Sequence, residues 1–553
     1  MMTFSGSFGC LIHRSGGSSS RFRILEAMRM SPNGILYRYG VMNIKSLLIV
    51  FLLLSTLILA CVCLTKYASV RPACLATAFT SLQNTQNEIA NSSHLRHAFV
   101  KPVQWDVDNR KLAAAANDRN GSTHAEGTDA ENGDGYHLGR DKIIFVDNVT
   151  AIHRRFKAFG SASSVFVHFG AYRGGDNSFV VVGLGSKPLH VYSDVTYMCE
   201  WEPANTHRPR SKAQAEKFFP DWGYGRVYTV VVVNCTFSEG VGLDGKGGKL
   251  ILHAISAGID MTTFTALKET NESFVASSSI YRQESYKYDF MYCGSSLFGD
   301  INPQRIREWL AYHTRLMGPR SHFVFHDAGG VSQGVRKVLL AWQALGYVTL
   351  HDIREQAKFD GYYYNQFLVV NDCLHRTRFL AKWTFFFDVD EYLYIPPHTT
   401  LLRTMESFAN YTQITFQQSP MSSKLCQSTQ NTSSRKTWAF EKLVFLNVKR
   451  GIRWDRKYAI QARNVLATGV HLSENLIGKT LHTKESAIKY YHYHNTITRR
   501  DEDLCKEVVN SSSTRLTTYS DKDPFRLDFG MQYFAQEVKK FELHQIGPQP
   551  FFT

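Results

Sequence analysis

Near the N-terminus the most regular feature of the chain is an uncharged apolar run at residues 47–64, flanked by Lys45 and Lys66. As a helix at about 1.5 Å per residue, this run would be about 27 Å long, which is close to the hydrocarbon thickness of a bilayer. A buried helix of a soluble protein would normally have a polar face, and this run has none. We therefore predict a cytosolic tail over residues 1–46 and a transmembrane signal anchor over residues 47–65.

Charged residues and glycosylation sequons orient this anchor. Several Lys and Arg but a single acid, Glu26, precede it, so the positive-inside rule keeps the N-terminus cytosolic. All eight N-x-S/T triplets begin after the anchor, at Asn91, Asn120, Asn148, Asn234, Asn271, Asn410, Asn431 and Asn510. Such triplets are glycosylated only in the secretory pathway. The sequence therefore predicts a type II membrane protein with its folded part in the lumen.

Two further regions follow the anchor before the pattern changes. Residues 66–140 are rich in Asn, Ala, Ser, Gly and charged residues, which predicts a flexible stem. Residues 141–270 contain short β-type runs separated by Gly, Asn and Asp, with no helical period between them. This pattern predicts an antiparallel β-sandwich, a carbohydrate-binding-like module. Its aromatic residues, among them Trp201, Trp222, Tyr224 and Tyr228, are expected either to stack on sugars or to fill the core.

From residue 283 onward, strand-like and helix-like segments alternate. The expected strands cover residues 288–293, 322–325, 347–350 and 382–387, and the expected helices cover residues 303–316, 335–342 and 362–376. Alternation of this kind is typical of a parallel α/β sheet, here predicted over residues 283–545. In such sheets, ligands bind beyond the carboxyl ends of the strands.

Two acids follow the last of these strands, at Asp388 and Asp390. If the strand continues through them, positions i and i+2 project to the same side, and both carboxylates address one divalent cation or one cation with a ribose. An apolar strand that runs into two acids is costly unless a cation is bound there. A phosphatase of the haloacid dehalogenase type also has D-x-D at a strand end, but it expects Thr or Val where this chain has Tyr392.

Four ordered motifs resemble glycosyltransferase family 92, and within it the plant β-1,4-galactan synthases. They are YCGSSLFGD (292–300), FVFHDAGG (323–330), QFLVVNDCLHR (366–376) and FFFDVDEYLYIPP (385–397). The resemblance implies a GT-A fold, inverting transfer from UDP-galactose and residence in the Golgi. It also implies a Mn²⁺ cofactor, with Mg²⁺ as an alternative, and β-1,4-galactan side chains of pectin as the acceptor.

The resemblance also implies roles for single residues. Asp388 and Asp390 are similar to the motif that holds the metal and the donor ribose, and His492 is expected to complete the metal shell, although His494 departs from the family pattern. For the nucleotide we expect contacts from residues at strand ends and on the helix over 362–376, namely Ser295, Asp327, Gln366, Asn371 and Asp372. Capping or solvent contact is the alternative for the helical ones. Lys457, Arg463 and Lys479 are candidate partners of the diphosphate.

Inverting transfer needs a carboxylate that takes the proton of the acceptor hydroxyl. Glu441 and Asp455 are the candidates, and the sequence does not rank them. Trp438 is expected to stack on acceptor sugars or to lie in the core.

Composition and cysteine content add little to this picture. The formal net charge of +15 fits an acidic partner, and with the resemblance it favours acidic pectin over nucleic acid. We expect disulfides among Cys199, Cys235, Cys293, Cys373, Cys426 and Cys505, with some free buried thiols. The sequence leaves open whether the protein forms a homodimer. The alternative function is a membrane-anchored glycan-binding protein without turnover.

Overall fold

The computed structural model describes residues 142–146, 149–160, 166–186, 195–222, 227–256, 259–359, 363–427, 437–448, 455–498, 504–509, 517–518 and 524–552. All of them belong to one compact unit, Ala125–Thr553. The predicted tail, anchor and stem lie outside the described residues. Among the described residues, none of the helices combines the length and apolar character that a bilayer crossing requires.

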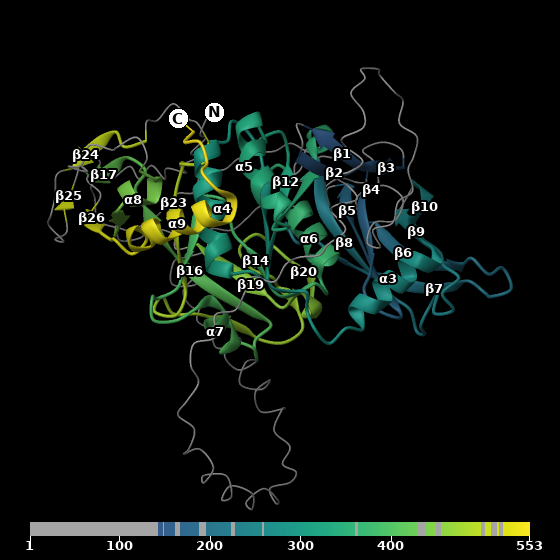
Figure 1. Cartoon of the computed structure of the whole chain (residues 1–553). Helices are drawn as coiled ribbons and strands as arrows, with labels where there is room; N and C mark the ends of the chain where they lie inside the picture. Colours follow the sequence, from purple (N-terminus) through teal and green to yellow (C-terminus); the bar gives the residue numbers. More distant parts are fainter. Residues whose placement is uncertain are drawn as a thin grey trace, which may run out of the picture. The chain divides into compact units, whose positions relative to one another are not determined.

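A mixed α/β sheet forms the larger part of this unit (Figure 1). Its main path runs β1-β2-β13-β12-β11-β14-β19-β16-β18-β26-β25, and β15, β22 and β23 join it beside this path. The bounds of the strands on the main path are β1 Lys142–Val146, β2 Val149–His153, β11 Tyr288–Leu297, β12 Ser321–Asp327, β13 Val348–Asp352, β14 Ala381–Phe386, β16 Gln413–Met421, β18 Phe445–Asn447, β19 Arg456–Ile460, β25 Thr517–Thr518 and β26 Pro524–Leu527. The three strands beside it are β15 Glu391–Tyr394, β22 Thr480–His482 and β23 Lys489–Tyr493.

The four expected strands β11, β12, β13 and β14 are present and parallel to one another. Beyond β14 the pairing becomes antiparallel, first with β19 and then with β16. The expected helices are present as α4 Pro303–Met317, α5 Gln333–Ala344 and α6 Gln366–Thr377. The alternating segments therefore fold as predicted up to the end of β14, which places the carboxyl ends of these strands along one edge.

Side chains of β11 alternate between two cores, because successive residues of a strand point to opposite faces. Phe290 and Tyr292 pack in the core that contains residues of α4 and α5. Met291 and Cys293 pack in the core that contains residues of α6. A disulfide between Cys293 and Cys373 joins β11 to α6. The helix that precedes the acidic motif is thus held covalently against the strand beside it.

A second sheet of eight described strands forms the β-rich module. Its order is β10-β9-β6-β7-β8-β5-β4-β3, with bounds β3 Lys157–Phe159, β4 Phe166–Arg173, β5 Ser178–Ser186, β6 Thr196–Pro203, β7 Ser211–Phe218, β8 Tyr228–Thr236, β9 Gly248–Ser256 and β10 Ile259–Glu269. Every described pairing in this sheet is antiparallel, as predicted. One apolar core includes residues of β4 and β5 together with residues of β6 and β9. A disulfide between Cys199 and Cys235 crosses this core.

One boundary of the module differs from the prediction. The strand at residues 142–146 was assigned to the β-sandwich, but β1 pairs with β2, and β2 pairs in parallel with β13 of the large sheet. Strand-like residues alone do not say which sheet a strand joins, because that depends on which unpaired edge is available. The module sheet accordingly begins at β3.

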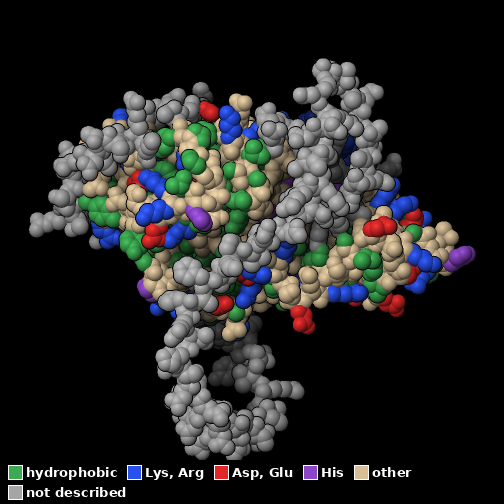
Figure 2. Space-filling view, in the orientation of Figure 1, with side chains coloured by type: hydrophobic (Ala, Val, Ile, Leu, Met, Phe, Trp, Pro, Cys, Tyr) green, Lys and Arg blue, Asp and Glu red, His purple; other side chains and the backbone are tan. Residues whose placement is uncertain are grey.

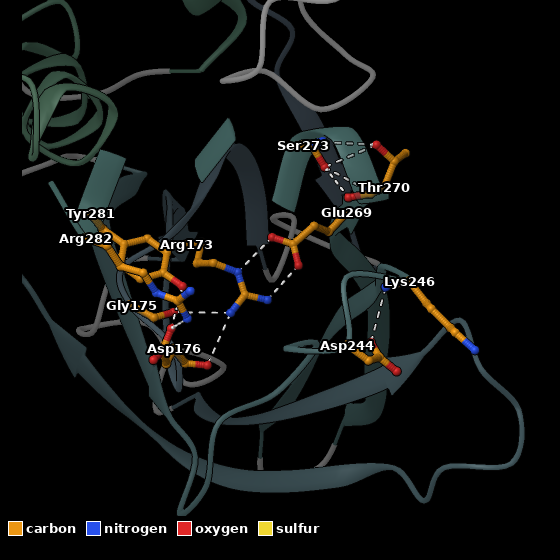
Figure 3. Close-up of polar contacts among 10 residues, drawn as sticks. All are labelled: Arg173, Gly175, Asp176, Asp244, Lys246, Glu269, Thr270, Ser273, Tyr281 and Arg282. Carbon is orange, nitrogen blue, oxygen red and sulfur yellow. Dashed lines mark hydrogen bonds and ion pairs between the residues drawn. The ribbon is translucent and has the colours of Figure 1, made fainter. Parts of the chain in front are cut away.

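The helix α3, Asn271–Tyr281, follows the last strand of the module (Figure 3). At its start, Glu269 forms a buried two-bond ion pair with Arg173, with N–O distances of 2.8 and 2.6 Å. At its end, Arg282 and the Tyr281 hydroxyl both contact the carboxylate of Asp176, each at 2.6 Å. Both ends of the helix are therefore tied to the same module.

All six cysteines expected to form disulfides are paired in the structure, the third pair being Cys426 with Cys505. The expectation of free buried thiols among these six is wrong. The third bridge joins the short parallel strands β17, Leu425–Gln427, and β24, Glu507–Val509. The remaining described helices are α7 Leu401–Glu406, α8 Ala439–Lys442 and α9 Ala535–Ile546.

Candidate active site

Asp388 and Asp390 lie in a turn that connects β14 to β15. β14 ends at Phe386, and the turn is closed by the Glu391 amide, which donates to the Asp388 carbonyl at 3.1 Å. The Glu391 carboxylate in turn accepts from the Asp388 amide at 2.7 Å. Strand alternation therefore does not place both acids on one side, as was predicted, because the strand ends before them. The turn holds their side chains 31% and 15% exposed.

Asp388 is oriented by three neighbouring side chains. Its Oδ2 is 2.7 Å from Nζ of Lys457, a residue of β19, and its Oδ1 accepts from Nε2 of Gln366 at 3.1 Å. The hydroxyl of Ser295, from β11, also bonds this carboxylate. Burial alone would raise the pKa of Asp388, but the Lys457 ammonium and these hydrogen bonds outweigh it, and the pKa is lowered. Asp388 is therefore ionised at neutral pH.

Asp390, Glu391 and His492 form a cluster with the composition of a metal site. One ligand atom from each lies within 4.8 Å of the others. Nε2 of His492 is 3.6 Å from Oδ1 of Asp390, and its Nδ1 is 3.7 Å from Oε1 of Glu391. His492 reaches this place because β23 pairs with β15 in a register that sets it opposite Glu391.

One further observation supports a divalent cation at this cluster. Oε1 of Glu391 is buried and has no hydrogen-bond partner within the part of the chain that the structure describes. A buried carboxylate oxygen without a partner is costly, and a cation would satisfy it. Two carboxylates and one imidazole are ligands that suit Mn²⁺, and carboxylates also suit Mg²⁺.

Charge in the cluster is only partly balanced by protein groups. Three carboxylates, Asp388, Asp390 and Glu391, face the single ammonium of Lys457, which is 3.5 Å from Glu391. Burial and the neighbouring Asp388 charge raise the pKa of Glu391 to about 7, although Lys457 opposes this shift. Burial would lower the pKa of His492, yet the charges of Asp390 and Glu391 raise it overall. The site therefore has room for further positive charge.

Glu391 is the ligand candidate that the sequence-based reasoning did not assign. The available signal was its position as a third acid directly after D-x-D. The turn and the pairing of β15 with β23 bring Glu391 to His492.

Of the expected nucleotide contacts, Ser295 and Gln366 lie at the cluster, where both bond Asp388. Asp327 lies at the end of β12, as expected, but its Oδ1 accepts from the amides of Gly329 and Val331 and the residue is 3% exposed. Burial raises its pKa. In this structure Asp327 stabilises the turn after β12 rather than facing a ligand.

Asn371 and Asp372 are not brought to the cluster. Asn371 donates to the carbonyls of Phe367 and Thr468 and accepts from the Thr468 amide, all within the interior. Asp372 is fully buried and forms ion pairs with Arg154 at 2.6 Å and Arg376 at 3.3 Å. Both residues lie on α6, where their side chains contact protein rather than open space. The structure thus favours a packing role for them over a nucleotide contact.

The two candidate bases differ sharply in their surroundings. Glu441 caps α8, accepts from the Trp438 amide at 3.0 Å and pairs with Lys539 at 2.8 Å, so its carboxylate is already engaged. Asp455 directly precedes β19 and is partly exposed. Burial and the adjacent His492 lower the pKa of His494 to about 4, and the charges of Asp390 and Asp455 oppose this shift. Asp455 is therefore the candidate whose charge acts on His494, two residues after His492 of the cluster.

Of the other residues expected to contact ligand, some lie at the cluster and others do not. Trp438 is 2% exposed and belongs to the core of the large sheet, so stacking on a sugar is not supported. Among the three candidate cations for a diphosphate, Lys457 contacts the acids directly. Arg463 instead donates to the carbonyl of Gln283 and lies over the Tyr286 ring. Trp201 lies in the module core, and Trp222 is 54% exposed with its indole donating to Glu474.

Comparison with known proteins matches the part of the chain that contains this site to a known family. Residues 288–532 match the model of glycosyltransferase family 92. Galactan beta-1,4-galactosyltransferase GALS1 of Arabidopsis thaliana is 52% identical over 400 residues, which are 71% of this chain and 79% of that protein. GALS2 of the same plant is 50% identical over 71% of this chain and 76% of its own length, and GALS3 is 48% identical over 72% and 79%. The similarity therefore extends well beyond the matched domain, and this chain belongs to glycosyltransferase family 92 and is a glycosyltransferase.

Proposed function

We propose that this chain transfers galactose from UDP-galactose, with inversion and with a divalent cation, to elongate β-1,4-galactan side chains of pectin. The carrying observation is the cluster of Asp390, Glu391 and His492, with its unsatisfied Glu391 oxygen, directly beside the ionised Asp388. A site with surplus carboxylate charge at the end of a parallel strand suits a cation together with a sugar diphosphate.

The acceptor and the sugar follow from the relatives. All three Arabidopsis proteins are named galactan beta-1,4-galactosyltransferases, and they are about half identical to this chain. The chain has a formal net charge of +15, and the positive charge that remains outside the proposed cytosolic tail would help to hold an acidic pectin backbone. On the face in Figure 2, Lys and Arg side chains are scattered among acidic ones rather than gathered into one stripe. This face therefore offers scattered cationic contacts to a polyanion.

The chain's own residues have distinct tasks in this proposal. Asp390, Glu391 and His492 would hold Mn²⁺ or Mg²⁺. The bound cation would neutralise charge on the departing diphosphate. Asp388, held by Lys457, Gln366 and Ser295, would accept from the ribose of the donor. Asp455 would take the proton from the acceptor hydroxyl as that oxygen attacks the anomeric carbon.

The arrangement of strands supports a GT-A fold for the catalytic part. Four parallel strands lead to the acidic turn. On the other side of the site, β19 pairs antiparallel with both β14 and β16, and β23 pairs in parallel with β16. The first half would bind the nucleotide, and the second half supplies Lys457 and His492. The ligand-bearing turn lies where the two halves meet.

The test is a transfer assay with a panel of UDP-sugars, galactan oligosaccharides as acceptors, and either chelator or added Mn²⁺. We expect transfer from UDP-galactose that chelator abolishes and Mn²⁺ restores, with a β-linked product identified by NMR. Transfer that is indifferent to chelator would remove the metal from the proposal. An α-linked product would remove inversion.

Asp390→Asn separates the enzyme from the alternative, a glycan-binding protein without turnover. We expect this variant to lose about 1000-fold in kcat/KM, because several kcal/mol of charge stabilisation are removed. Its melting temperature should stay near that of the unchanged protein. The matched control is Glu406→Gln, which alters an exposed acid on α7 and should leave transfer unchanged. Full activity of Asp390→Asn would contradict the proposed site.

We further propose a Golgi-resident type II membrane protein, anchored by residues 47–65 with the catalytic part in the lumen. The support is the apolar run, the charge before it and the sequons after it. In sealed Golgi vesicles, added protease should leave the folded part intact until detergent is present. Digestion of the folded part without detergent would reverse this topology.

A further inference from the structure

Two exposed aromatic rings are stacked on each other near the acidic turn. The ring centroids of Phe298 and Tyr364 are 3.7 Å apart, with 17° between the ring planes. Phe298 is 39% exposed and Tyr364 is 46% exposed. Exposed large aromatics cost free energy when hydrated, and each ring of this pair uses only one face for the other. Both side chains therefore keep surface that a further flat group can contact.

The pair is held in place from both sides. Phe298 directly follows β11, and the hydroxyl of Ser296 donates to the Tyr364 carbonyl at 3.0 Å. On the other side, the buried Asn365 side chain donates to Oε1 of Gln356 at 2.9 Å and to the Phe359 carbonyl at 3.0 Å. These contacts fix the backbone on which Tyr364 is carried.

That backbone has an unusual conformation. Tyr363, Tyr364 and Asn365 have φ angles of 48°, 53° and 58°, so three consecutive residues with side chains lie in the left-handed region. This region disfavours such residues by about 1–2 kcal/mol each, and strain of this kind persists where a function requires it. The strained turn precedes α6, which begins at Gln366, and it places the Tyr364 ring on Phe298.

Residues close in sequence to each ring of the pair contact Asp388 in the proposed donor site. Ser295, three residues before Phe298, bonds Asp388. Gln366, two residues after Tyr364, bonds the same carboxylate at 3.1 Å. Ser295 and Phe298 are three residues apart, so their Cα atoms are at most about 10 Å apart. Asp388 is proposed to bind the ribose, and in a nucleoside the base is joined directly to the ribose.

We propose that Phe298 and Tyr364 form the platform on which the uracil base of the donor stacks. An acceptor sugar is a poorer match, because its attacking hydroxyl must reach the anomeric carbon, which adjoins the diphosphate. The platform instead lies on the strand side of the site, where Ser295 and Gln366 orient Asp388. A flat π-system suits stacking on an aromatic face, and such a stack contributes affinity for a base without a hydrogen bond.

This inference rests on the proposed function, since it assumes a uridine diphosphate donor. The test measures binding of UDP and of inorganic pyrophosphate to the full-length protein by calorimetry in the presence of Mn²⁺. The variants are Tyr364→Ala, Phe298→Ala and Tyr364→Phe. The matched control is Tyr533→Ala, which removes another exposed tyrosine, 65% exposed, from a 3₁₀ turn before α9.

We expect Tyr364→Ala and Phe298→Ala to weaken UDP binding about 10- to 100-fold, because a stacking partner of the base is lost. Pyrophosphate binding should be unchanged in both, which also shows that the variants are folded. Tyr364→Phe and Tyr533→Ala should bind UDP like the unchanged protein.

Four results would overturn the inference. UDP affinity that survives both alanine substitutions removes the platform. Equal losses for UDP and pyrophosphate point to a damaged site rather than a lost stack. A raised KM for galactan oligosaccharides with unchanged UDP affinity assigns the rings to the acceptor. If the unchanged protein binds UDP no more tightly than pyrophosphate, a uridine diphosphate donor is contradicted, and the platform is contradicted with it.

Discussion

Two charged clusters in this protein, one around Asp372 and one in the acidic turn, have opposite net charge. Around Asp372, one carboxylate is surrounded by the guanidinium groups of Arg154 and Arg376 and by the hydroxyl of Tyr172, and its side chain is 0% exposed. In the acidic turn, three carboxylates share the single ammonium of Lys457, and Asp388 is 31% exposed. The first group is closed and carries surplus positive charge, whereas the second is open and carries surplus negative charge.

The difference shows which acids are structural. Burial alone would raise the pKa of Asp372, but Arg154 and Arg376 hold it well below its usual range. Every contact of this carboxylate is therefore internal, and it joins α6 to Arg154, which follows β2, and to Tyr172 of β4. Around Asp390 and Glu391, the balance is incomplete and one oxygen is unsatisfied. An incomplete balance of this kind supports the cation site that we propose.

The largest effect on this comparison is expected from Asp372→Ala. The substitution leaves two arginines buried without their partner, so we expect a loss of about 3–5 kcal/mol in the free energy of unfolding. Chemical denaturation measures it. Asp176→Ala is the control, since Asp176 pairs with Arg282 at the surface, with side chains 49% and 54% exposed, and should cost less than about 1 kcal/mol. Equal losses in the two variants would refute the closed character of the Asp372 group.

Lys457→Met tests the open group. Without Lys457, the acids of the turn repel one another, and we expect the metal-free protein to lose about 1–3 kcal/mol of stability. Added Mn²⁺ should restore most of this loss, because the cation replaces the missing positive charge. Thermal unfolding with chelator and with Mn²⁺ measures both effects.

The control for this test is Lys382→Met, which alters a lysine of β14 outside the cluster. Its response to Mn²⁺ should equal that of the unchanged protein. If Mn²⁺ stabilises Lys457→Met no more than it stabilises Lys382→Met, then the acids of the turn do not form the cation site.

At pH values just below 6.5, the smallest effect is a pH dependence of the closed group. His326 is fully buried near Asp372, Arg154 and Arg376, and burial lowers its pKa from 6.5 to about 3. The unfolded chain therefore binds a proton below pH 6.5 that the folded protein does not bind. Stability contributed by the neutral ring is complete above pH 6.5 and falls by about 1.4 kcal/mol per pH unit down to about pH 3.

His326→Leu should reduce the slope of unfolding free energy against pH by this amount. Neither ring nitrogen of His326 has a hydrogen-bond partner among the described residues, so the substitution breaks no hydrogen bond in that part of the chain. Denaturation curves between pH 4 and pH 7 provide the measurement. An unchanged slope would show that the ring accepts a proton in the folded state.

Much of the catalytic sheet was predictable from local pattern. The segments that became β11, α4, β12, α5, β13, α6 and β14 were expected in their order and type. Each of them combines a clear period with a terminating signal, such as Pro303 at the start of α4 or Gly346 after α5. Local signals suffice where an element buries one regular face.

Pairing between distant strands was not predictable in the same way. The strand at residues 142–146 looked like those of the module, yet β1 and β2 extend the large sheet. Likewise, β15 was not expected as a separate strand, and its pairing with β23 places His492 opposite Glu391. Which edges meet depends on the packing of the whole chain, which short apolar runs do not encode.

The roles of polar residues were only partly predictable. Asp372 and Gln366 lie on the same helix and were both expected to contact the nucleotide, but Gln366 bonds Asp388 whereas Asp372 pairs with Arg154. Arg154 is separated from Asp372 by 218 positions in the chain. Glu441 similarly meets Lys539, which is 98 residues away. No local pattern reveals such distant partners.

By itself, the sequence determined the succession of anchor-like, β-rich and alternating segments, the acidic motif after an apolar strand, and the resemblance to glycosyltransferase family 92. Only the tertiary structure decided which acids are saturated by arginine or lysine and which keep an unsatisfied oxygen. The reason is physical: the periodicity of an element depends on its own residues, whereas the charge and hydration of a carboxylate depend on groups that folding brings from elsewhere in the chain.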